Sequence, residues 1–429
     1  MAETTRAQRS SGRVAVAQSI VVGSSFAMLL AGSNAVNPLL PIYREQLGLD
    51  PLVLSLTFVL YVAVLVCALF FLARPGRAHH ATPFLLASLA LLIASDLLLA
   101  HAQEWSILAG RVCAGLSGGL GTGAASALVV AAIGAKGRAV TATGNFVGGV
   151  LGAGASQLVV SLIGEAAPQA VFLGHAAIVA ALLLAAIVVL RARRDANHAD
   201  LTEAPGTPAP ARIDRRAVRM FATGTIAWTA TSVAVVFGAT VFADLGQPLV
   251  QAIGPTLLLG TSASAQLASP AITRIAPWIS GALAMGLGIA GMLSGAWLAL
   301  DALAIAGFAV LGAGVGVSFR AGLIALARGA SPSRQGSLAS LYAAVTYTVS
   351  AATVLTVGWA GNTTGLVPAV FAALGAVGTV SIFALIWTPR LRDTFEPLLA
   401  STAHPAFTPR DSRVVGRSVT GRKHASIPQ

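Results

Sequence analysis

The sequence RARRDANHADLTEAPGTPAPARIDRRAVR (residues 191–219) is the only long polar interruption between Val14 and Trp387. Its middle part, Ala204–Ala211, contains three prolines, and proline removes a backbone donor and fixes φ. This part therefore cannot form a helix or a strand. Arginines lie on both sides of it: Arg191, Arg193, Arg194, Arg212, Arg215, Arg216 and Arg219. We predict two apolar halves of similar length that are joined by a flexible, basic linker.

The composition indicates that the two halves lie in a membrane. The mean hydropathy is +0.80, with 56% hydrophobic and 10% charged residues, whereas a soluble domain carries about a quarter charged residues. The net charge of +12 sits in tails and short loops, where membrane topology and anionic lipid headgroups account for it. We expect the lipid bilayer as a partner and no nucleic acid. Cys67 and Cys113 lie in apolar stretches without metal-ligand spacing, so we expect neither a metal nor a cofactor.

Apolar stretches long enough to cross a bilayer follow one another on both sides of the linker. The first could be read as a signal peptide, but it is about 20 residues long and further spans follow at once. Lys and Arg concentrate in alternate loops, which the positive-inside rule assigns to the cytoplasm. We predict an all-α membrane protein with twelve transmembrane helices in two six-helix bundles and both termini cytoplasmic. The spans are expected at 14–34, 52–72, 83–99, 108–133, 139–163 and 170–190, then at 220–242, 249–268, 277–298, 302–327, 337–359 and 366–387.

These spans define the expected domain organisation. The polar run Asn37–Asp50, which contains two prolines, is expected to be the first outer loop. The parts are a cytoplasmic N-terminal tail (1–13), an N-terminal bundle (14–190), the linker (191–219), a C-terminal bundle (220–388) and a cytoplasmic, disordered tail (389–429).

The fourth span has the most distinctive pattern. Gly115, Gly119 and Gly123 recur every four residues, which removes side chains from one face and allows a neighbouring helix to approach closely. Arg111 lies in the same span, where a guanidinium needs a partner or water. Asp96 on the third span is expected at a similar depth. Two readings stay open: an ion pair that clamps two helices, or Arg111 as an anion binder or member of a proton relay.

Six spans, a basic inner linker and six further spans resemble the major facilitator superfamily of secondary transporters over residues 14–388. Four local patterns agree with this resemblance. Arg320 with the following residues 331–336 resembles the region of spans ten and eleven in bacterial members. Arg74, Gly76 and Arg77 match the signature loop after the second span, although Ala73 occupies the position of its Asp. Arg111 and Gly115 match the fourth-span motif, whose Arg faces the central cavity. Gly144, Gly148 and Gly152 resemble the fifth-span motif of drug/proton antiporters, without its Pro.

The resemblance implies a substrate site near the midplane, between two halves that rock about it. It also implies that spans one, four, seven and ten line the cavity. The substrate-binding residues expected on these spans are Ser24, Asn34, Arg111, Thr122, Trp228, Thr229, Ser318 and Arg320. We place no carboxylate in this lining, and proton coupling normally needs a titratable acid that water can reach.

We therefore expect a monomeric secondary active transporter of the bacterial plasma membrane. By this interpretation it exports a drug-like or metabolite solute by alternating access, with proton coupling left open. One alternative is a facilitator or importer of a small organic anion. An alternative of another class is a non-transporting membrane sensor or scaffold. No HExxH motif, paired carboxylate cluster or Ser-His-Asp set is present, so we expect no enzyme and no catalytic residues.

Overall fold

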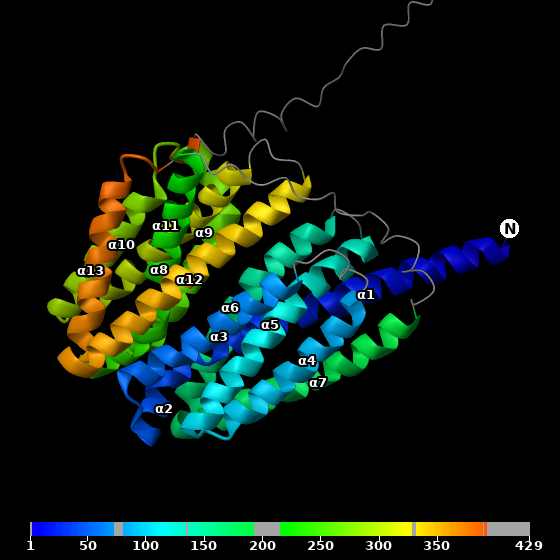
Figure 1. Cartoon of the computed structure of the whole chain (residues 1–429), viewed down its shortest axis with the longest axis horizontal. Coiled ribbons are helices and arrows are strands. Elements are labelled where there is room, and N and C mark those ends of the chain that lie inside the picture. Colours follow the sequence, from blue (N-terminus) through cyan, green and yellow to red (C-terminus); the bar gives the residue numbers. More distant parts are fainter. Residues whose placement is uncertain are drawn as a thin grey trace, which may run out of the picture.

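The computed structural model describes residues 2–72, 80–133, 136–192, 215–327, 332–388 and 390–392. These residues form helices that gather into two groups (Figure 1). The first group consists of α1 (Ala2–Ala35), α3 (Pro51–Leu72), α4 (Ala81–Ala100), α5 (Glu104–Ile133), α6 (Lys136–Ile163) and α7 (Ala167–Ala192). The second consists of α8 (Arg215–Asp244), α9 (Pro248–Ile275), α10 (Gly281–Trp297), α11 (Asp301–Ala327), α12 (Pro332–Thr364) and α13 (Leu366–Ala384).

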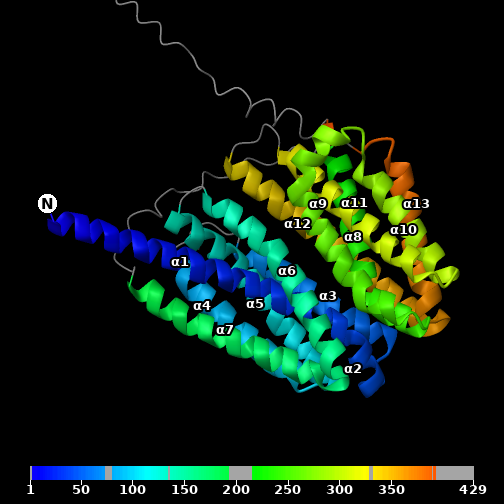
Figure 2. The ribbon, with the colours of Figure 1, turned by 180° about the vertical axis from the view of Figure 1, so that it is seen from behind.

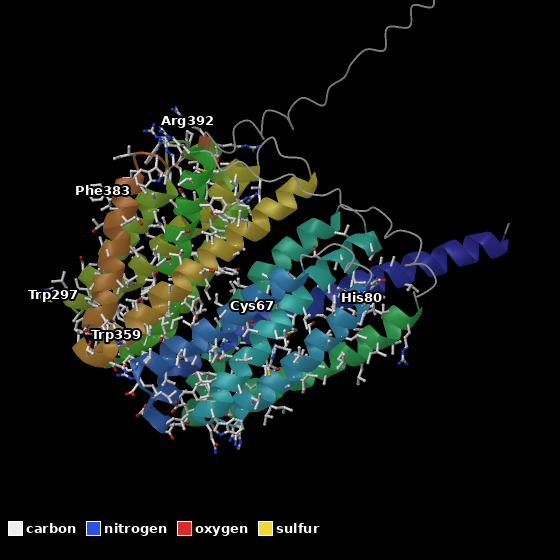
Figure 3. The ribbon with its side chains drawn as sticks, in the orientation of Figure 1. Cys67, His80, Trp297, Trp359, Phe383 and Arg392 are labelled. Atoms are coloured by element: carbon white, nitrogen blue, oxygen red, sulfur yellow. The ribbon has the colours of Figure 1, made fainter. Side chains whose placement is uncertain are left out.

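These helices correspond in order to the predicted spans, which confirms an all-helical membrane architecture. Among the described residues, nine stretches are long and apolar enough to cross a membrane, and one of them runs through both α6 and α7. Large apolar side chains face outward, such as Leu162 (72% exposed) and Ile386 (84% exposed). Trp297 and Trp359 project near helix ends (Figure 3), as expected for side chains at a membrane interface. The number of crossings and the side of each terminus stay predictions.

The two groups of helices lie side by side in the views from front and back (Figures 1 and 2), and they repeat one pattern of helix neighbours. In the first group α4 packs against α5 and α7, and α1 packs against α6. In the second, α10 packs against α11 and α13, and α8 packs against α12. The groups meet through α3 with α12 and through α6 with α9, which are equivalent pairs in the repeat. Two related six-helix bundles therefore face each other.

The predicted first outer loop is wrong, because Asn37–Leu47 is helical. The short helices η1 (Asn37–Leu39) and α2 (Leu40–Leu47) bury Leu39, Leu40 and Tyr43. The Tyr43 hydroxyl donates a hydrogen bond of 2.8 Å to the carbonyl of Leu99. Proline at the first positions of a helix is tolerated, and Gly48 ends α2 in the left-handed conformation (φ 64°). The prolines therefore end α1 but start a second helix.

The helices beside the predicted N-terminal tail and linker are longer than the predicted spans. α1 begins at Ala2, so it extends through the predicted tail 1–13. α7 continues to Ala192 and α8 begins at Arg215, while residues 193–214 and 393–429 lie outside the described residues. Leu391 is buried, and its backbone N–H donates to the carbonyl of Ile279. Leu391 and Arg392, which belong to the predicted C-terminal tail, therefore contact residues 277–279.

Glycines allow the helices to approach backbone to backbone, as the fourth-span pattern indicated. A Cβ on Gly115 would overlap the carbonyl oxygen of Tyr61 on α3, and a Cβ on Gly119 would overlap Ala68 on the same helix. Gly123, the third member of the stripe, meets no atom within 4 Å. On α6, Gly148 and Gly152 lie against the backbone of α1 at Ala27 and Ala31 in the same way. The contacts of Gly144, and the whole of Arg74, Gly76 and Arg77, lie outside the described residues.

Candidate functional site

A cavity of about 180 Å³ lies between the two bundles. Residues of α1, α3, α5 and α6 line it from one side, and residues of α8, α9, α11 and α12 from the other. Pockets for drug-sized ligands have about 300–1,000 Å³, so this cavity suits a small solute. The polar residues of the lining are Ser33, Asn34, Asn37, Arg111, Thr231, Ser232, Ser262 and Gln266, together with the aromatic hydroxyls of Tyr61 and Tyr347.

Arg111 is the positively charged residue among those that line the cavity. No anionic side chain lies beside it among the described residues. The side chain is 2% exposed. Its Nε donates to the Thr57 carbonyl at 2.7 Å, and Nη1 donates to the Ser33 carbonyl at 3.1 Å. The guanidinium carbon lies 4.5 Å from the centroid of the Tyr61 ring. Among the described residues no carboxylate lies within ion-pair distance of Arg111. A guanidinium has five N–H donors, so donors remain for a bound solute.

The predicted ion pair between Asp96 and Arg111 is wrong. Asp96 on α4 contacts His175 on α7, with Oδ2 and Nδ1 separated by 2.7 Å, whereas Arg111 bonds to α1 and α3. Asp96 and Arg111 come from antiparallel neighbouring helices. Their side chains nevertheless point to different neighbours, because similar depth in the membrane does not place two residues on facing sides.

An aromatic cluster forms the wall that the second bundle contributes. The ring centroid of Trp228 on α8 lies 4.8 Å from that of Tyr347 on α12 and 5.5 Å from that of Phe319 on α11. All three residues line the cavity. The buried Trp228 Nε1 has no hydrogen-bond partner among the described residues. This wall offers flat apolar area and one indole donor, which together fit the ring of an aromatic solute.

The structure divides the predicted substrate-binding residues into two sets. Asn34, Arg111 and Trp228 line the cavity. The others lie elsewhere: Ser24 is exposed on α1, Thr122 donates to the Gly118 carbonyl within α5, Thr229 is buried, Ser318 faces α10 at Gly281, and Arg320 is half-buried on α11. Neighbouring residues of a helix point about 100° apart. This rotation explains why Trp228 faces the cavity and Thr229 does not.

Several lining residues were not among the predicted site residues. Gln266 on α9 is a buried amide in an apolar span, and a polar residue inside a span is by itself a hint of function. Tyr61 on α3 gives the same hint within the predicted second span. Asn37 was assigned to the outer loop, and the η1 helix brings it to the cavity.

Polar contacts join the two bundles at the end of the molecule that carries α2. Nη1 of Arg44 on α2 lies 2.8 Å from both carboxylate oxygens of Asp244, the last residue of α8. The backbone N–H of Leu52 on α3 donates to Oδ1 of Asn362 on α12 at 3.0 Å. Gly358 on α12 lies against Pro51 and Ser55 of α3 with no room for a Cβ. The bundles are therefore closed against each other at this end.

Comparisons with known proteins agree with this architecture. The family model described as Major Facilitator Superfamily matches residues 22–354. The nucleoside transporter NupG is similar in structure, with a TM-score of 0.63, 13% identity and coverage of 86% of this chain and 99% of that one. A peptide transporter POT, solved in complex with sulfate, has a TM-score of 0.62 and 15% identity, and covers 86% of this chain and 94% of its own.

A bacterial homologue of the human lysosomal transporter Spinster, solved in an inward-facing and occupied conformation, has a TM-score of 0.59 and 12% identity. The match covers 90% of this chain and 96% of that one. At these identities the likeness shows the fold alone. The comparison with curated protein sequences gave no significant match.

Proposed function

Because this chain belongs to the Major Facilitator Superfamily, we propose that it is a secondary transporter that carries a small aromatic or apolar organic anion across the plasma membrane. The observation that carries this proposal is Arg111, a buried cation in the wall of the central cavity with no carboxylate beside it among the described residues. A charge buried without a partner is costly. An anionic solute would supply the missing partner, which favours it over a cation.

The two walls of the cavity suggest how such a solute is held. Its anionic group would accept hydrogen bonds from the remaining N–H groups of Arg111, and its ring would lie against Trp228 and Tyr347. A hydrogen bond to a charged group contributes about 1.5–3 kcal/mol. The amides of Asn34 and Gln266, which also line the cavity, offer further donors and acceptors and so select among anions of similar size.

In a mechanism of alternating access, the contacts between the bundles at the α2 end would close one side of the carrier. The positive-inside rule places that end outside the cell, so the closed contacts describe a state that is shut toward the outside. Rocking of the bundles about the cavity would separate α3 from α12 and open the outer side. We keep export as the expected direction, and flux is therefore measured both ways.

The test is exchange of radiolabelled benzenesulfonate across proteoliposomes, compared with neutral benzenesulfonamide of nearly the same shape. Benzenesulfonate stays ionised, so it does not leak through the bilayer as a free acid. We expect wild-type protein to exchange the sulfonate in preference to the sulfonamide. In Arg111→Gln, the loss of a charged hydrogen bond is expected to weaken apparent affinity for the sulfonate by roughly 10- to 100-fold.

Arg274→Gln is the matched control, because Arg274 is an exposed arginine near the end of α9 and lies outside the cavity lining. It should keep wild-type affinity. Equal exchange of the sulfonate by wild type and Arg111→Gln would overturn the role of Arg111. Saturable binding of the sulfonate without exchange in either direction would favour the sensor or scaffold alternative.

A smaller effect is expected for the ion pair at the α2 end. The side chains of Arg44 and Asp244 are 30% and 35% exposed, and exposed pairs contribute at most about 1 kcal/mol. Arg44→Gln should therefore change the exchange rate by less than roughly fivefold. Asp244→Asn should give a similar change, and the double variant should be no worse than either single one. A total loss of exchange in Arg44→Gln would show that this pair is a required latch.

A further inference from the structure

A buried pair of ionisable side chains lies inside the first bundle, apart from the cavity lining. The side chains of Asp96 on α4 and His175 on α7 are 1% and 10% exposed, and Nδ1 lies 2.7 Å from Oδ2. The other ring nitrogen of His175, Nε2, lies 3.2 Å from the backbone carbonyl of Met28 on α1. Oδ1 of Asp96 is buried without a hydrogen-bond partner among the described residues. The pair thus joins three helices.

The geometry determines how many protons this pair holds. A carbonyl oxygen only accepts hydrogen bonds, so Nε2 must carry a hydrogen to bond to Met28. A second hydrogen must then lie between Nδ1 and Oδ2, because two lone pairs at 2.7 Å would repel. Whether it belongs to the imidazole or to the carboxyl, the pair is neutral as a whole. The two contacts of His175 fit the form of the pair that holds this proton.

Loss of this proton would remove the hydrogen bond between Asp96 on α4 and His175 on α7. The remaining carboxylate and the Nδ1 lone pair would face each other inside an apolar bundle, with a net charge of −1. A buried, uncompensated charge is unstable, so release requires that the helices move apart or that water enters. Release of the proton would therefore require an arrangement of the pair different from the one described.

Other ionisable groups on the helices around the pair do not contact it. Within the described side chains of α4, α5, α7 and α1, these groups are Glu104, Arg111 and Cys113 on α5 and Arg191 on α7. Arg111 bonds to Thr57 and Ser33. Glu104 and Arg191 lie at helix ends. The described part of the bundle thus offers the proton no other acceptor beside His175 and Asp96.

Two short connections link the pair to the cavity. The first connection runs along α1. Nε2 of His175 contacts the backbone carbonyl of Met28, and five residues later the backbone carbonyl of Ser33 accepts a hydrogen bond from Arg111. Ser95, the neighbour of Asp96, donates at 2.9 Å to the carbonyl of Gly110, the neighbour of Arg111. A change in the spacing of α4, α7 and α1 would therefore move α1 at Ser33 and α5 beside Arg111, whereas the hydrogen bond of Arg111 to Thr57 on α3 is not linked to the pair.

We propose that Asp96 and His175 form a proton-binding site that couples transport to the proton gradient. A hydronium ion gives its proton to Nδ1 or Oδ2, so one of its O–H bonds breaks as the N–H or O–H bond of the pair forms. Release returns the proton to water by the reverse step. This inference rests on the proposed function, because coupling needs a carried solute. It adds the driving ion and the residues that bind it.

The test compares two assays of benzenesulfonate in proteoliposomes. Exchange without a pH gradient reports the carrier function alone, whereas accumulation under a pH gradient reports coupling. For one proton per cycle, a gradient of one pH unit should raise wild-type accumulation by up to about tenfold. Asp96→Asn keeps the size and hydrogen bonding of the side chain but does not titrate. It should keep exchange within about threefold of wild type and lose the response to the gradient.

Asp301→Asn is the matched control, since Asp301 accepts a hydrogen bond from Gln247 in the second bundle and its variant should keep gradient-driven accumulation. If Asp96→Asn does not fold, His175→Asn takes its place in the test. It too should keep exchange and lose the response to the pH gradient. Gradient-driven accumulation by both variants at the wild-type level would overturn the proposal.

A second measurement needs no solute. Thermal unfolding of the full-length protein in detergent is followed between pH 5 and 9. Loss of the proton would leave an uncompensated charge buried between α4 and α7, so wild type should lose stability as the pH rises. The Asp96→Asn variant should lose less thermal stability than wild type between pH 5 and 9. If the stability of both proteins changes with pH in the same way, the proposed proton site is wrong. If wild type shows no benzenesulfonate exchange, the proposed function fails for this anion, and these curves still decide whether the pair binds a proton.

Discussion

Oxidation of a Pro51→Cys/Gly361→Cys pair is expected to abolish exchange of benzenesulfonate, and reduction is expected to restore it. A Cβ on Gly361 of α12 would lie 3.0 Å from the Cβ of Pro51 on α3. Disulfides join Cβ atoms about 3.5–4.5 Å apart, so a shift of about half an ångström suffices. The disulfide would tie the two bundles at the end that must open, which leaves one half of the transport cycle inaccessible.

The pair is introduced in a background in which the free cysteines Cys67 and Cys113 are replaced by alanine. An Ile289→Cys/Gly378→Cys pair is the matched control, because it joins α10 and α13 inside the second bundle with a Cβ separation of 3.5 Å. Its oxidation should leave exchange intact. Mass spectrometry measures the extent of cross-linking. Full exchange by a Pro51→Cys/Gly361→Cys protein that is completely cross-linked would contradict rocking of the bundles at this contact.

Replacement of Gly115 by leucine is expected to prevent assembly of the first bundle. A Cβ at this position already overlaps the backbone oxygen of Tyr61 and lies 3.1 Å from Cβ of Val64. Backbone atoms cannot move aside as a side chain can, so α3 and α5 must separate along their contact. Overpacking by a few methylene groups costs about 1–3 kcal/mol, and a leucine against backbone is expected to exceed this range.

Gly123→Leu is the matched variant on the same helix, since Gly123 is exposed and meets no atom within 4 Å. The measurement is the monodisperse fraction of each fluorescently tagged protein after size-exclusion chromatography in mild detergent. We expect the Gly123 variant to equal wild type, and the Gly115 variant to retain a small fraction of it. Equal yields for the two leucine variants would show that α3 and α5 are not held at backbone distance.

The helices could be predicted from the sequence because the chemistry of the bilayer determines them locally. A backbone in lipid must satisfy its own hydrogen bonds, so an apolar stretch such as 52–72 has to be helical, and α3 covers 51–72. The error at Asn37–Leu47 arose outside the apolar core, where proline and polar residues are compatible with either a loop or a short helix. There the burial of Tyr43 between helices decided the outcome.

The site could be predicted only in part. Arg111 stood out, because a charge in the middle of a span needs a reason, and it does line the cavity. Its partner could not be inferred, since the choice between Asp96 and backbone carbonyls depends on how α5 is rotated about its axis. The pairing of Asp96 with His175 joins residues 79 positions apart, and neither residue carries a local signal for the other.

The sequence by itself determined that this chain is an all-helical membrane protein, approximately where its helices lie along the chain, and which motifs it shares with secondary transporters. These properties depend on the composition and on the lengths of the apolar stretches, which can be read from neighbouring residues in the chain. Only the tertiary structure decided which face of each helix meets the cavity, that Arg111 bonds to backbone carbonyls rather than to Asp96, and that Asp96 contacts His175. These properties depend on the rotation and approach of helices far apart in the chain, which packing between them sets.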